Sequence, residues 1–102
     1  MNSKKKQLQL FTHLKKYKID VALLQEHNIR KENVICNEIL DEYHVEINFS
    51  ISLKGGTAIM INRRLPYKII SVEKAESSRI TTLKLRIYDQ IFKFIDHICS
   101  FR

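Results

Sequence analysis

This sequence has little glycine, proline and cysteine. Only two glycines and one proline occur among its 102 residues, so long flexible linkers are not expected. Its two cysteines, Cys36 and Cys99, form no CxxC pattern, which favours two reduced, partly buried thiols and an intracellular location, nuclear or cytoplasmic. The longest apolar runs, such as residues 21–24, are far too short to cross a bilayer. We therefore expect no membrane partner.

Several common catalytic patterns are also missing. The four histidines are scattered without metal-site spacing, and no HExxH motif or cysteine cluster occurs, so zinc is not expected. No serine stands in a nucleophile-elbow context. Gly55-Gly56 is not followed by the Lys-Ser or Lys-Thr of a P-loop and is better read as a turn or bulge that opens a strand. These absences argue against a small-molecule cofactor.

Positive charge is abundant. The formal net charge is +7 and the isoelectric point is about 9.6, a balance that suits a polyanionic partner, most simply nucleic acid. Solvated surface side chains are the alternative reading, and they account well for the N-terminal lysines. The basic clusters are Lys4–Lys6, Lys15-Lys16-Lys18, Arg30-Lys31 and Arg63-Arg64.

The apolar pattern predicts one small α/β domain. Residues 4–18 have the spacing of an amphipathic helix with Ser3 as its N-cap. The apolar run at residues 19–24 predicts a buried strand, parallel to another strand and covered on both faces. Residues 31–42 have a weakened helical pattern and stay ambiguous. Five segments alternate or are rich in β-branched residues and predict further strands: residues 44–51, 57–61, 67–72, 80–88 and 91–98.

The candidate for chemistry is Glu26, which directly follows the expected strand at residues 19–24. Open α/β sheets place reactive groups at the carboxyl ends of their strands, and a carboxylate there can hold Mg²⁺ together with water and substrate phosphate. A solvated or salt-bridged glutamate is the alternative. In the last expected strand, Phe92, Phe94 and Asp96 share one face.

Two motifs carry a family resemblance. Leu24-Gln25-Glu26-His27, after a helix and an apolar strand, is followed later by Gly55-Gly56 and the strand Thr57-Ala58-Ile59-Met60-Ile61. This order resembles the apurinic-type endonuclease domain of LINE (non-LTR) retrotransposons, in the endonuclease/exonuclease/phosphatase family. The resemblance runs from about residue 6 to residue 97. It implies a four-layer, DNase-like α/β sandwich, here partial, with a mixed, largely antiparallel sheet and one or two helices.

The same resemblance implies the roles of individual residues. Glu26 takes the place of the family's catalytic glutamate and ligand of one Mg²⁺ ion, and the activity would be hydrolysis of DNA phosphodiester bonds. His27 and Asn28 could touch substrate or serve as hydrogen-bond partners. Arg30 and Arg63, if they lie near Glu26, could hold phosphates, so Asn28, Arg30 and Arg63 are the nucleic-acid-binding candidates.

Other family features have no counterpart here. The opening strand with its asparagine is missing, and Asn2 has no apolar strand around it. The downstream Asp/Asn pair and the closing Asp-His pair are also missing, and Asp96-His97 lies on the wrong strand for the latter. We therefore expect residues 1–102 to be a single partial domain, inactive alone as an endonuclease. The alternative is a non-catalytic basic nucleic-acid-binding module or a decayed retroelement product.

Overall fold

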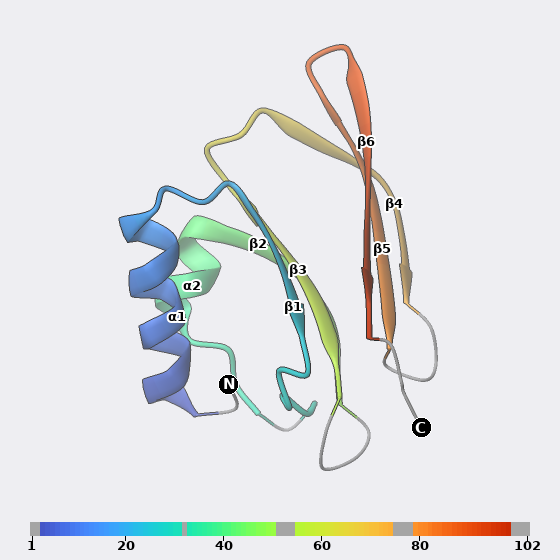
Figure 1. The fold of residues 1–102 in the computed structure, drawn as a ribbon. Coiled ribbons are helices and arrows are strands. Elements are labelled where there is room, and N and C mark those ends of the chain that lie inside the picture. The colour runs from blue at the N-terminus through green and yellow to red at the C-terminus, as the bar shows by residue number, and fades with distance from the viewer. Residues whose placement is uncertain (1–2, 32, 51–54, 75–78, 99–102) are drawn as a thin grey trace.

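The protein is built in three layers in the computed structural model, which describes residues 3–31, 33–50, 55–74 and 79–98. Two helices cover one face of a three-stranded sheet, and a second three-stranded sheet covers its other face (Figure 1). A mixed α/β class with largely antiparallel strands is thereby confirmed. The elements are α1 (Lys4–Lys16), β1 (Val21–Gln25), α2 (Asn37–Glu42), β2 (Tyr43–Asn48), β3 (Thr57–Asn62), β4 (Tyr67–Lys74), β5 (Ile80–Ile87) and β6 (Gln90–His97).

The first sheet has the order β1-β3-β2, and the second has the order β4-β5-β6. Every pairing is antiparallel, so the prediction that the strand after α1 is parallel to its neighbour is wrong. In β1, Val21 pairs with Ile61 and Gln25 pairs with Thr57. The strand is also an edge strand, with Leu23 36% exposed. The central strand of the first sheet is β3, which is buried on both faces.

Alternation along β3 creates two apolar cores. Met60 faces the helices and packs with Leu14 of α1 and Ile39 of α2. Ile59 and Ile61 point to the other face, where they pack against the second sheet. Leu83 and Leu85 of β5 complete this second core, and all these side chains are at most 2% exposed. Each buried side chain of this size contributes about 1.5–3 kcal/mol.

Both ends of α1 have recognisable caps. Ser3 accepts a hydrogen bond from the Lys6 amide, as its N-cap position predicts. At the other end, Lys18 has a φ of 51°. The amide of Lys18 donates to the carbonyl of Lys15, and the amide of Ile19 donates to the carbonyl of Leu14. This pair of bonds is a Schellman motif, with Lys18 at the position that usually carries glycine.

The other expected elements are confirmed with small shifts of their ends. In the ambiguous segment 31–42 the structure describes the short helix α2, and the five expected strands correspond to β2–β6. Gly55 and Gly56 both have positive φ and open β3. In the described part of the chain no helix is both long and apolar enough to span a membrane. Expectations for Asn2, Ile51 and Cys99 fall outside the described residues, whereas Cys36 is a buried free thiol.

Candidate functional site

The two motifs that carry the resemblance meet at one end of the first sheet. Gln25 at the end of β1 pairs with Thr57 at the start of β3. Glu26 therefore emerges beside the Gly55-Gly56 turn, as an exposed side chain whose φ of 51° lies in the left-handed region. A non-glycine residue there costs about 1–2 kcal/mol. The chain thus presents a carboxylate to solvent at a position where glycine would be less strained.

His27 is the next residue, and it turns inward. Its side chain is 2% exposed. The ring Nδ1 accepts from the amide of Ile29 at 2.8 Å, so Nε2 carries the proton and is shared between the carbonyls of Asn48 at 3.2 Å and Thr57 at 3.3 Å. A Cβ atom on Gly56 would lie 2.2 Å from the ring Cε1. The His27 ring therefore needs glycine at that position.

Asn28 completes the connection to the glycine turn. Its backbone amide donates to the Gly55 carbonyl at 3.0 Å, and its side-chain Oδ1 accepts from the Gly55 amide at 3.2 Å. Asparagine tolerates the left-handed conformation found here, with a φ of 60°. These contacts give Asn28 a structural task, which is to hold the loop that bears Glu26 against the start of β3.

Asp96 of the second sheet holds the same end of the first sheet. It lies on β6 of the second sheet and is completely buried. Its Oδ1 accepts from the Gln25 side chain, and its Oδ2 accepts from the Ala58 amide at 3.1 Å. Burial raises the pKa of this carboxyl group, against the opposing effect of its hydrogen bonds. Next to it, the hydroxyl groups of Thr57 and Thr81 lie 2.7 Å apart and join the two sheets.

The burial of His27 predicts acid sensitivity. Burial lowers the pKa of its imidazole, because a charged ring would lose hydration. Protonation of Nδ1 would also break the bond from the Ile29 amide. Because the pKa of His27 is lower in the folded protein, the neutral ring stabilises the fold at pH values above the pKa of the unfolded chain, about 6.5. This stabilisation is lost as the pH falls through the pKa of the folded protein.

We therefore expect the free energy of unfolding, measured by urea denaturation, to fall more between pH 7 and pH 5 in the wild-type protein than in His27→Gln, which shares the titration of Asp96. NMR titration of the ring Cε1–H of His27 would give a midpoint below that of the urea-unfolded chain. A midpoint equal to that of the unfolded chain would contradict this assignment of the neutral ring.

Arg30 lies at this end of the molecule, and Arg63 does not. Arg30, Lys31 and Lys74 line a hollow of about 750 Å³ together with the end of β2. Arg63 follows β3 at its far end, so the length of β3 from Thr57 to Asn62, about 17 Å at ~3.4 Å per residue, lies between Arg63 and the Glu26 end. Arg63 was expected to hold phosphates only if it lay near Glu26, and it does not lie there.

The donor set at this end fits one position of a magnesium site. Mg²⁺ is usually bound by one or two carboxylates, with waters and substrate phosphates in the other positions. Glu26 offers an exposed carboxylate, whereas both oxygens of Asp96 are engaged inside the protein. Among the described residues no group of three or more Asp, Glu, His or Cys side chains could hold a metal ion. Glu26 therefore offers a single carboxylate that fits one ligand position.

Sequence reasoning missed two features of this end. The burial and hydrogen bonding of Asp96 were missed, although Asp96 was placed correctly on the face of Phe92 and Phe94. A charged residue on an apolar face was the signal for both. Lys74 follows from no sequence motif. It comes close because Lys74, at the end of β4, reaches β2, where its ammonium group lies 3.4 Å from Glu46. A comparison with models of known protein families and one with curated proteins both give no match.

Proposed function

We propose that this chain is part of a Mg²⁺-dependent endonuclease domain of the endonuclease/exonuclease/phosphatase family, acting on DNA inside the cell. The supporting observation is the junction of the two resembling motifs. Gln25 pairs with Thr57, the His27 ring is hydrogen-bonded to the Thr57 carbonyl, and Asn28 is hydrogen-bonded to Gly55. This junction supports Glu26 in a strained, solvent-facing conformation, and strained residues of this kind are concentrated at functional sites.

In this proposal Glu26 is a metal ligand, and the bound ion would polarise a phosphoryl oxygen of the DNA. The chain's own residues have three tasks. Glu26 supplies the carboxylate, His27 and Asn28 fix its backbone, and Arg30 and Lys31 hold backbone phosphates on the neighbouring surface. Hydrolysis needs several groups around one phosphate, so the described residues are expected to bind DNA and metal without cutting efficiently.

The layering also agrees with the proposal. The order helix, sheet, sheet (Figure 1) is that of three consecutive layers in a four-layer α/β sandwich. The free outer face of the second sheet carries exposed apolar residues, among them Ile91 and Ile95, which are 53% and 55% exposed. A further helical layer would cover this face in a complete sandwich. A DNase-like fold is therefore part of the proposal.

The test uses Mn²⁺ as a paramagnetic probe in place of Mg²⁺, with a short DNA duplex present. Amide NMR signals of residues 25–28 are expected to broaden in the wild-type protein and to stay sharp in Glu26→Gln. Glu38→Gln, which removes an exposed carboxylate from α2, is the matched control and should leave the broadening intact. Broadening that is unchanged by Glu26→Gln would remove the metal-ligand role.

A plasmid-nicking assay with Mg²⁺ complements this measurement. We expect little nicking from the wild-type chain and none from Glu26→Ala. Efficient nicking that requires both Mg²⁺ and Glu26 would establish the endonuclease activity and would show that the residues present suffice for it.

A non-catalytic basic nucleic-acid-binding module is the second candidate. The observation that favours it is the hollow lined by Arg30, Lys31 and Lys74, which come from two separate segments of the chain. Binding through these charges alone would weaken steeply with salt and would not respond to divalent metal or to Glu26. The Mn²⁺ experiment therefore separates the two candidates.

A further inference from the structure

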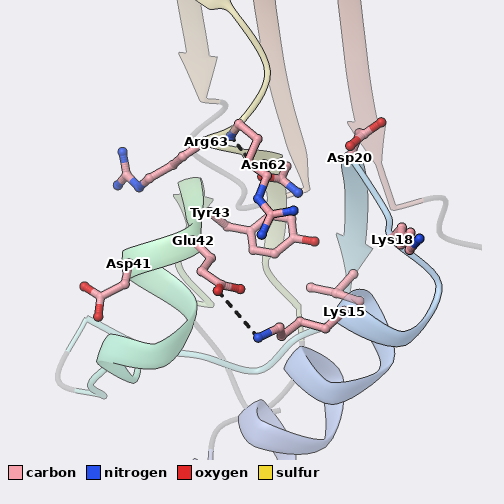
Figure 2. A pocket seen from close by; sticks show the side chains of 10 residues that line it. Lys15, Lys18, Asp20, Asp41, Glu42, Tyr43, Asn62 and Arg63 are labelled. Carbon is pink, nitrogen blue, oxygen red and sulfur yellow. Dashed lines mark hydrogen bonds and ion pairs between the residues drawn. The ribbon is translucent and has the colours of Figure 1, made fainter.

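The opposite end of the first sheet contains a second basic hollow. It has a volume of about 660 Å³ and lies between the C-terminal ends of α1 and α2 and the turn from β3 to β4 (Figure 2). Four cationic side chains line it, Lys15, Lys18, Arg63 and Arg64. Arg63 lies here, about 17 Å along β3 from the Glu26 end, at ~3.4 Å per residue.

Three carboxylate side chains also line this hollow, those of Asp20, Asp41 and Glu42, so its lining carries a net charge of +1. Glu42 forms an ion pair with Lys15 at 3.5 Å. In Figure 2 the carboxylate of Asp41 points outward, away from Tyr43. Within the described residues, Lys18 and Arg64 have no ion-pair partner. Lys18 and Arg64 can therefore each receive an anionic group.

Lys18 occupies this place at a cost in stability. It is the left-handed residue of the Schellman motif that ends α1, a position where glycine carries no steric penalty. A lysine held there against its backbone preference is best explained by what its side chain does. That side chain lines the hollow.

An aromatic ring lies next to Lys18 in the sequence. Tyr17 is 58% exposed. Its ring is supported by the His13 ring, at a centroid distance of 4.6 Å, and by the Lys16 ammonium group, 5.4 Å from the ring centroid. An exposed, supported ring among cations is the arrangement on which unpaired nucleobases stack.

We propose that this end of the molecule binds single-stranded nucleic acid, with backbone phosphates on Lys18 and Arg64 and a base stacked on Tyr17. A duplex buries its base faces in its own stack, whereas a single strand exposes them to an aromatic side chain. A hollow of this volume also admits a nucleotide-sized group. The site is independent of the function proposed for Glu26, because it uses none of the residues at that end.

Fluorescence anisotropy with labelled twelve-nucleotide oligo(dT) and oligo(rU), and with a duplex of equal length, tests the proposal. Lys18→Gly is expected to raise the melting temperature by about 4 °C and to weaken single-strand binding roughly fivefold. Arg64→Gln should weaken binding to a similar extent, and Tyr17→Leu by about tenfold. In the double variant with both Lys18→Gly and Arg64→Gln, the slope of log Kd against log salt concentration should be smaller by about 1.4 than in the wild-type protein.

A control variant separates this site from general attraction. Lys5→Gln removes one exposed charge at the other end of α1 and should change single-strand affinity less than twofold. Losses with Lys5→Gln equal to those with Lys18→Gly, or an equal loss of duplex and single-strand affinity with Lys18→Gly, would mean diffuse electrostatic binding and would overturn the proposal. Unchanged affinity in a more stable Lys18→Gly protein would overturn it as well.

Discussion

Replacing Gly56 by alanine is expected to lower the free energy of unfolding by about 3–5 kcal/mol, at the upper end of single-residue effects. Gly56 has a φ of 91°, which strains any L side chain. The new Cβ would also lie 2.2 Å from Cε1 of the His27 ring. The ring has no room to retreat, because it is 2% exposed and bonded to backbone groups on three sides.

Urea denaturation of Gly56→Ala measures this loss, and a double-mutant cycle with His27→Ala identifies its cause. Removing the ring creates space for the new methyl group. The cost of Gly56→Ala should therefore be smaller by 1 kcal/mol or more in the His27→Ala background, where roughly only the backbone strain of about 1–2 kcal/mol remains. Equal costs in both backgrounds would show that the ring is not the obstacle.

Asp96→Ala is expected to cost about 3 kcal/mol. The substitution leaves the buried Ala58 amide without its acceptor and removes the bond from the Gln25 side chain; an unsatisfied buried polar group costs about 1–3 kcal/mol. The cavity at a fully buried position adds to this loss. Thermal and urea unfolding would both detect the change. Because Asp96 joins the second sheet to the strands of the first, a cost below 1 kcal/mol would contradict its anchoring role.

Asp96→Asn should behave differently, and the difference depends on pH. The asparagine Oδ1 can still accept from Ala58, and its amide can donate to the Gln25 side chain once that side chain turns over. The pKa of Asp96 is raised by burial. Because the pKa of Asp96 is higher in the folded protein, its protonated carboxyl group stabilises the fold fully at pH values below the pKa of the unfolded chain, about 3.9. This stabilisation is lost as the pH rises through the pKa of the folded protein.

The stability of Asp96→Asn relative to the wild type is therefore expected to increase from pH 4 toward neutrality. Urea denaturation of both proteins across this range checks it, and because His27 is retained in both, its own titration cancels in the difference. Parallel curves for the two proteins would show that the carboxyl group does not titrate in this window.

Local sequence patterns predicted the elements well and their partners poorly. The Ser3 cap, the amphipathic helix α1 and the alternation of β2 are properties of neighbouring residues, and the structure agrees with them. The direction of β1 relative to its neighbour is not a local property. An apolar run is compatible with a parallel or an antiparallel partner, and here the partner is β3, which comes three elements later in the chain.

In the candidate site, too, local features could be predicted from the sequence and tertiary positions could not. Glu26 could be placed at the end of a strand because both the strand and the glutamate are read from adjacent residues. Arg30 follows within the same loop. The positions of Arg63 and Lys74 depend on which end of β3 or β4 each residue occupies, and that is set by the antiparallel register. The folded chain therefore distributes its basic residues between two ends that the sequence does not distinguish.

The central strand β3 also determines how the molecule comes apart. Its alternate side chains belong to both apolar cores, Met60 to the helical one and Ile61 to the one between the sheets. β3 cannot leave without opening both cores. We therefore expect the helical layer and the second sheet to unfold as one cooperative unit, with the slowest amide hydrogen exchange among the described residues at residues 58–61.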